Sequence, residues 1–113
     1  MNGGVQAEQW ASQYLVRHGL KLIEQNYRSR FGEIDLIMRD GMALVFVEVR
    51  LRRNSSYGGA AASIDKHKQQ RIIRTAQQYL AGLAHPPSCR FDVVLMEDAQ
   101  GLKAQWLKNA FDA

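Results

Sequence analysis

The sequence predicts an α/β fold in which two helices flank a mixed central sheet. Two segments, 5–19 and 63–83, carry apolar residues at helical spacing, and several short runs outside them have strand character. An Asp-Gly pair at 40–41 separates two of these runs, which is a strong hairpin signal. The chain has 113 residues, 46% of them hydrophobic, which is enough for one domain with a buried core. We therefore predict a single domain over 1–113.

The first helix is expected at 5–19, because apolar residues recur there at the i, i+3, i+4 and i+7 spacing: Ala7, Trp10, Ala11, Tyr14 and Leu15. Gly19 suits the position just past the end of this helix, where the backbone commonly turns left-handed. A short strand is expected at 20–28, and a turn at 29–31.

The next two strands are expected at 32–38 and 43–49. If Asp40 and Gly41 form a two-residue turn, Glu33 lies opposite Glu48 and Asp35 lies opposite Phe46. This register is supported because it produces one fully apolar face: Ile34, Leu36, Met38, Ala43, Val45, Val47 and Val49. The second of these strands is apolar on both faces up to Val47, which indicates a central strand covered on both sides.

The C-terminal half continues the pattern of alternating element types. A Ser-, Gly- and Ala-rich loop is expected at 54–62, and a second helix at 63–83. The apolar stripe of this helix is Ile72, Ile73, Ala76, Tyr79, Leu80 and Leu83. Two prolines at 86–87 follow the helix, then a strand at 89–96 and a short final strand at 102–107.

Composition excludes several classes of protein. A single cysteine, Cys89, excludes a disulfide scaffold. No apolar run approaches the ~20 residues of a membrane helix, so no membrane partner is expected. The first residues are neither basic nor followed by an apolar segment, so we expect no secretion signal and a cytoplasmic location. The three histidines are isolated, with no zinc-ligand spacing, and no phosphate-loop pattern occurs.

Positive charge is concentrated in one segment, although the net charge of the chain is only +4. Residues 50–74 hold seven basic side chains and one acid, a net of +6, and the remainder holds 8 basic and 10 acidic side chains, a net of −2. The basic residues are Arg50, Arg52, Arg53, Lys66, Lys68, Arg71 and Arg74. Such a patch is typical of a protein that binds a polyanion, and equally of a solvated surface that binds nothing.

Three carboxylates meet at one end of the predicted hairpin: Glu33, Asp35 and Glu48. Opposed like charges destabilise a sheet, so a cation is expected beside them. Arg50 on the same face can supply part of that charge, and Mg²⁺, which prefers oxygen ligands, can supply the rest. Glu8 is a candidate fourth carboxylate, and Lys68 lies on the inward stripe of the second helix. The alternative is a surface hairpin end whose acids point into water.

In its ordered motifs, nearly the whole chain resembles the YraN family of small bacterial proteins, within the restriction-endonuclease-like (PD-(D/E)XK) nuclease superfamily. The matching pieces include Ala7-Glu8, Asn26, Gly32-Glu33-Ile34-Asp35, Val47-Glu48-Val49, Lys68 and Arg90-Phe91-Asp92. The resemblance implies an αβββαβ core, and it implies that Glu8, Asp35 and Glu48 hold Mg²⁺ or Mn²⁺ for phosphodiester hydrolysis. Arg50 stands where the motif has a lysine; arginine keeps the charge but does not readily give up a proton.

Two functions are therefore expected from the sequence. The first is a metal-dependent nuclease acting on DNA, including branched DNA, with Glu8, Asp35, Glu48 and Arg50 as catalytic residues. The nucleic acid would be bound by basic residues of the same segment: Arg52, Arg53, Lys66, Lys68 and Arg71. The second is a nucleic-acid-binding protein with little or no catalytic activity on a nuclease scaffold. A protein-partner adaptor is a weaker third option, and a homodimer is compatible with the resemblance.

Overall fold

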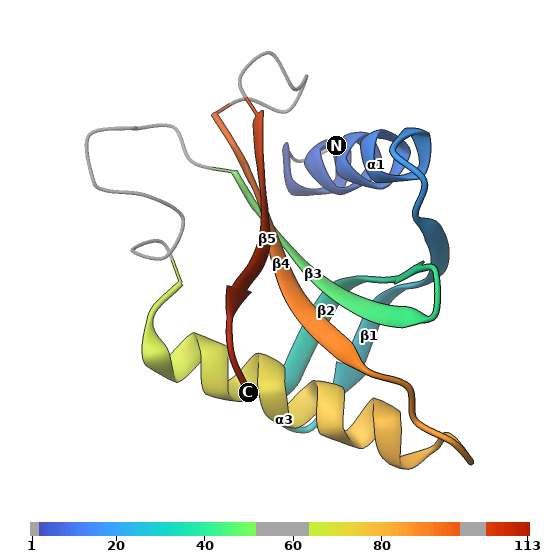
Figure 1. Ribbon diagram of the computed structural model, residues 1–113. Helices are drawn as coiled ribbons and strands as arrows, with labels where there is room; N and C mark the ends of the chain where they lie inside the picture. The colour runs from blue at the N-terminus through green and yellow to red at the C-terminus, as the bar shows by residue number, and fades with distance from the viewer. Residues whose placement is uncertain (1–2, 52–63, 98–103) are drawn as a thin grey trace.

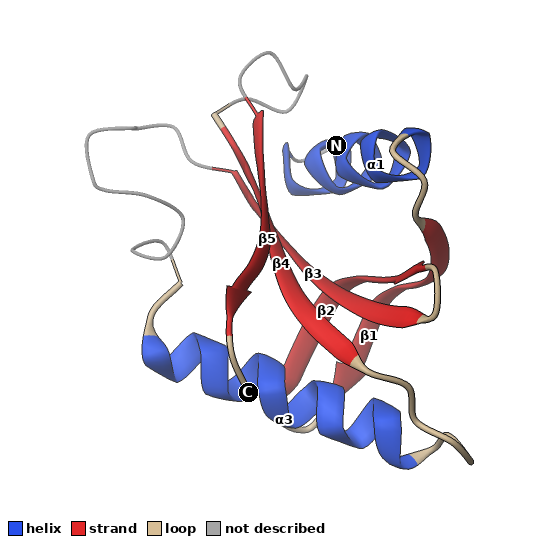
Figure 2. Ribbon diagram, in the orientation of Figure 1, coloured by secondary structure: helices blue, strands red, loops and turns tan. Residues whose placement is uncertain are grey.

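The computed structural model describes residues 3–51, 64–97 and 104–113, and it shows a mixed α/β fold (Figures 1 and 2). The elements in chain order are α1 (Gly3–Arg17), β1 (Lys21–Ser29), β2 (Gly32–Asp40), β3 (Ala43–Leu51), α3 (Lys66–Ala81), β4 (Cys89–Met96) and β5 (Ala104–Phe111). The five strands form one sheet in the order β1-β2-β3-β4-β5. The β3–β4 pair is parallel and the other three pairs are antiparallel. The predicted mixed sheet with two flanking helices is confirmed.

The two helices cover opposite faces of the sheet, as Figure 1 shows. The α1 side buries an aliphatic cluster with Ala11, Leu15 and Val45 at its centre, all 0% exposed. The α3 side buries a second cluster, in which Phe46 stacks on Phe91 with ring centroids 5.6 Å apart. Since β3 is buried on both faces, the prediction of a central, doubly covered strand is confirmed.

The helix ends follow from local chemistry. Helix α1 ends at Gly19, whose φ of 99° is left-handed, and the Leu20 N–H donates to the Leu15 carbonyl across the turn. Helix α3 begins after Asp65, whose carboxylate accepts a hydrogen bond from the Lys68 N–H at 2.8 Å. Both helices end about two residues earlier than the predicted segments, and α3 begins three later. No helix in the described part of the chain is long and apolar enough to cross a membrane.

The hairpin turn differs from the prediction by one position. Asp40 pairs with Ala43, so the two turn residues are Gly41 and Met42 rather than Asp40 and Gly41. A φ of 61° at Gly41 is typical of the first central residue of a type II′ turn, a position that favours glycine. The pairing shifts by two residues, so Ile37, not Asp35, lies opposite Phe46. Because strand side chains alternate with a period of two, this shift keeps Asp35 and Glu48 on the same face.

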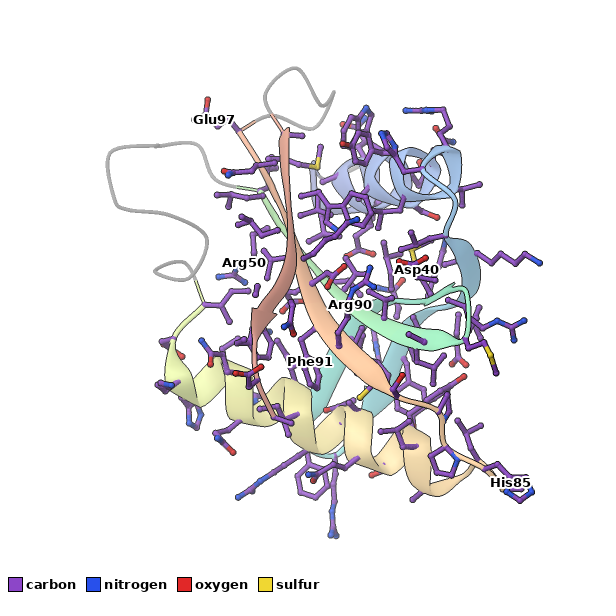
Figure 3. The ribbon with its side chains drawn as sticks, in the orientation of Figure 1. Asp40, Arg50, His85, Arg90, Phe91 and Glu97 are labelled. Carbon is purple, nitrogen blue, oxygen red and sulfur yellow. The ribbon has the colours of Figure 1, made fainter. Side chains whose placement is uncertain are left out.

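The C-terminal strands form around a buried acid. Strand β4 has the predicted bounds, and the last strand, β5, begins two residues later than predicted and ends four later. The fully buried Asp92 accepts hydrogen bonds from Arg90, from the Trp106 indole and from the Asn109 N–H. Arg90 also contacts Asp40 at 3.0 Å, which ties β4 to the hairpin; Figure 3 shows the two side chains near each other. The predicted loop at 54–62 lies outside the described residues.

Candidate functional site

Strands β2 and β3 stop pairing where the acids lie. Their pairing runs from Asp40↔Ala43 to Leu36↔Val47. Beyond that point, the Val49 N–H donates to Asp35 Oδ2 at 2.8 Å, so a side chain takes the place of a backbone partner. The change in strand geometry also explains Ile34, which packs in the α3-side cluster and not on the α1-side face predicted for it. The carboxylate of Asp35 is thereby held at the junction of the two strands.

Asp35 and Glu48 form a carboxyl pair with little access to water. The Glu48 side chain is only 5% exposed. Burial, followed by the hydrogen bond and the charge repulsion from Glu48, raises the pKa of Asp35 to about 8. The hydrogen bond from the Val49 N–H acts in the opposite direction but does not offset these effects. At neutral pH the pair therefore retains a proton, which a bound cation could replace.

Helix α3 brings a cation directly to this pair. Lys68, in the first turn of the helix, places its Nζ 3.3 Å from Glu48 Oε2. The Lys68 side chain is 38% exposed, so it connects the buried carboxylate with the solvent. The sequence-based expectation that an inward lysine on this helix needs an anionic partner is confirmed.

Asn26 links Glu8 to the hairpin. Its Nδ2 donates to Glu8 Oε1 and to Glu33 Oε1, both at 2.9 Å. The backbone of Asn26 has a φ of 52°, a left-handed conformation that asparagine tolerates better than most residues. Burial raises the pKa of Glu8, and the hydrogen bond from Asn26 partly offsets this effect. No role was predicted for Asn26, because neither its left-handed backbone nor its two contacts leave a periodic signal in the sequence.

The donor chemistry of the acid pair fits a hard divalent cation. Within the described ranges, no three His, Cys, Asp or Glu side chains gather into a ready-made metal-binding group. Glu8 is therefore near Asp35 and Glu33 without completing a three-ligand set with Glu48. Mg²⁺ is commonly held by one or two carboxylates together with waters and substrate phosphates. Asp35 and Glu48 satisfy that requirement, and their repulsion is what such an ion would relieve.

The predicted basic residues do not all converge. Lys68 and Arg71 line one pocket of about 460 Å³ beside the acids, together with Arg28 of β1, which was not predicted. Lys66 lines a different depression, near the end of β5. Arg50 extends from β3 on the side away from α1, where α3 begins (Figure 3). Arg52 and Arg53 lie outside the described residues.

The fold and the site define a small mixed α/β protein with a buried acid pair beside a basic pocket. The model of the uncharacterised protein family UPF0102 matches residues 7–96. A UPF0102 protein of Nitrosospira multiformis is 52% identical over 109 residues, covering 96% of this chain and 92% of that protein. Another, from Nitrosomonas europaea, is 53% identical over 111 residues, covering 98% and 94%. A third, from Methylococcus capsulatus, is 50% identical over 111 residues, covering 97% and 90%.

This chain therefore belongs to the uncharacterised family UPF0102, the YraN family. The family resemblance that the sequence motifs indicated is confirmed. The names of these relatives state no activity, so what the site does is argued below from its residues.

Proposed function

We propose that this protein is a metal-dependent nuclease with a restriction-endonuclease-like core, hydrolysing phosphodiester bonds of DNA, branched DNA included. The observation that carries the proposal is the Asp35–Glu48 pair, held at the separation of β2 and β3 with Lys68 3.3 Å from Glu48. The element order, with the antiparallel β1-β2-β3 strands followed by α3 and a parallel β4, supports the same superfamily. Metal-dependent nucleases need clustered carboxylates beside positive charge, and both occur here.

The residues of the site divide the work as follows. Asp35 and Glu48 would hold Mg²⁺ or Mn²⁺, which supplies Lewis-acid activation of water and stabilises charge on the phosphate. The Val49 N–H fixes the orientation of the Asp35 carboxylate before any ligand binds. Glu8 would act from α1 as a further acidic group, oriented by Asn26. Lys68 would stabilise the negative charge that develops on the phosphate during attack.

Lys68 also bears on the arginine at the motif position. Arg50 can contact phosphate through its planar fork but does not readily give up a proton. A lysine ammonium can lose its proton when its surroundings favour the neutral form, and Lys68 is in contact with the site. We therefore assign charge stabilisation to both residues and any proton transfer to Lys68 alone. Lys68→Arg should then preserve nucleic-acid binding and lower cleavage, whereas Arg50→Lys should preserve both.

Cleavage of labelled duplex, flapped, four-way-junction and single-stranded DNA tests the proposal. The wild type is compared with Asp35→Asn and Glu48→Gln in Mg²⁺ or Mn²⁺, with EDTA as the metal-free arm. Glu24→Gln is the charge-matched control, because Glu24 is an exposed carboxylate on β1. Cutting that requires the metal and is lost in both site variants but not in the control supports the nuclease. Cutting retained in both site variants would reject it.

The second candidate function is nucleic-acid binding without cleavage. The observation that favours it is the closed arrangement of the acids, in which Lys68 contacts Glu48 and a three-ligand group is absent from the described residues. This function predicts DNA binding in EDTA that weakens linearly with the logarithm of salt concentration. Binding without any metal-dependent cutting, from a folded protein, would favour this candidate over the nuclease.

A further inference from the structure

The basic pocket beside the acids has the chemistry of a phosphate site. It lies between the β1–β2 end of the sheet and the first turns of α3, and Gly32 and Ser29 line it together with its charged residues. Three of these are cationic, Arg28, Lys68 and Arg71, and Glu33 is the only acid among the lining residues. The pocket is thus a polar hollow of net positive charge, a few hundred Å³ in volume, which suits a small multivalent anion.

Both arginines are held by the atom that leaves their forks available. Arg28 contacts Glu33 Oε2 through Nε at 3.2 Å, and Arg71 donates from Nε to the Phe31 carbonyl at 2.9 Å. In the described part of the chain, no hydrogen bond engages the terminal Nη atoms of either side chain. The main-chain anchor orients Arg71 before a ligand arrives, which lowers the entropic cost of binding. Guanidinium groups with free Nη atoms match the oxygens of phosphate in a bidentate way.

The position of Lys68 relates this pocket to the acid pair. Lys68 both lines the pocket and contacts Glu48 Oε2 at 3.3 Å, so the two sites share this side chain. A phosphate in the pocket would therefore be a neighbour of a phosphate at the acids, and not the same group. Positive charge continues along the turn, where the guanidinium groups of Arg30 and Arg74 lie 5.0 Å and 5.8 Å from the Phe31 ring centroid.

We propose that Arg28, Lys68 and Arg71 form a dedicated pocket for a nucleic-acid phosphate that adjoins the one at Asp35 and Glu48. The proposal rests on the proposed function for the identity of the ligand as nucleic acid. The bound phosphate belongs either to the internal backbone or to a strand terminus, since the same oxygens are offered by both. Such a pocket would fix the register of the strand relative to the acids without reading its sequence.

Fluorescence anisotropy in EDTA tests the pocket apart from cleavage. Binding of labelled duplex DNA, with and without a 5′-phosphate, is measured over a series of salt concentrations. Arg28→Gln and Arg71→Gln should each reduce the slope of log affinity against log salt by about 0.9, the value for one lost phosphate contact. Arg39→Gln is the matched control, because Arg39 is an exposed arginine at the opposite end of β2 from the pocket, and it should leave the slope unchanged.

Further variants keep the test decisive. Glu33→Gln removes the acid of the pocket and should tighten binding, the opposite direction from the arginine variants. If Arg71→Gln fails to fold, Arg28→Gln decides alone, because the Arg28 side chain is 78% exposed. A preference for the 5′-phosphate that is lost in the arginine variants assigns a terminal phosphate, and equal losses for both DNAs assign an internal one. Slopes that match those of Arg39→Gln would overturn the pocket, while loss of cleavage alone would leave it standing.

Discussion

Replacing Asp35 with asparagine should stabilise the protein, and the gain should depend on pH. In the folded protein the pKa of Asp35 is raised from 3.8 to about 8, chiefly by burial and then by Glu48. Below pH 4 the group is protonated whether the chain is folded or not, so its ionisation carries no cost. As pH rises from about 4 to about 8, the unfolded chain loses the proton while the folded chain retains it, so the free energy of unfolding falls.

The size of this effect follows from the shift. Each pH unit within the window costs about 1.4 kcal/mol, and pH 7 lies about three units above the ordinary pKa, so the cost at pH 7 is up to about 4 kcal/mol. This is a large share of the ~5–15 kcal/mol by which domains are stable. Asparagine resembles the protonated acid, because it can accept from the Val49 N–H and donate to Glu48, yet it has no charge to lose. The Asp35→Asn variant should therefore exceed the wild type by up to about 4 kcal/mol at pH 7.

Urea unfolding followed by tryptophan fluorescence measures this difference at pH values from 4 to 8. The expected result is a gap between Asp35→Asn and the wild type that is near zero at pH 4 and widens toward pH 8. Glu24→Gln on the exposed surface of β1 provides the baseline for removing one carboxylate. A gap that stays constant across this range, or that widens no faster than in Glu24→Gln, would refute the argument that Asp35 holds its proton in the fold.

Three more results are expected. Mg²⁺ should raise the melting temperature of the wild type at pH 7, by the equivalent of about 2.7 kcal/mol at 100 times Kd, and an equal shift in Asp35→Asn would contradict the assigned ligands. Asn26→Ala should destabilise more than Asn26→Gly, by about 1 kcal/mol in urea unfolding, because glycine tolerates the φ of 52°; the reverse order would contradict this account. Asp92→Asn should cost about 3 kcal/mol, because it leaves the Arg90 guanidinium without its buried partner, and a melting temperature within a degree of the wild type would contradict it.

Periodicity predicted the layers of this fold better than it predicted the strand pairing. The alternation of apolar residues identified the faces of β2 and β3, and these faces were nearly right even though the turn was placed one residue early. A register error of two residues preserves the faces, so the apolar face that supported the predicted register could not distinguish it from the true one. The choice of Gly41 as the first turn residue depends on its φ, which the Asp-Gly pair alone does not specify.

The parts of the site that could not be predicted depend on local departures from regular structure. Ile34 changes sides because β2 leaves β3 at Asp35, and an alternation rule assumes that the strand stays regular. Arg28 reaches the basic pocket from a strand whose own residues carry no marked charge pattern. The acids at 35 and 48 and the lysine at 68 were predictable, because their polarity interrupts otherwise apolar runs.

The strain in the acid pair is itself an argument about function. A fold needs no carboxylate at the junction of β2 and β3, since an asparagine at position 35 could make the same hydrogen bonds without the electrostatic cost. Lys68 reaches Glu48 but is partly exposed, so it offsets the repulsion incompletely. A divalent cation would relieve the remainder and release the proton that Asp35 retains, so its affinity should rise with pH through the same window in which stability falls. Coupling between Mg²⁺ affinity and pH would therefore connect the electrostatic cost in the fold to the chemistry proposed for the site.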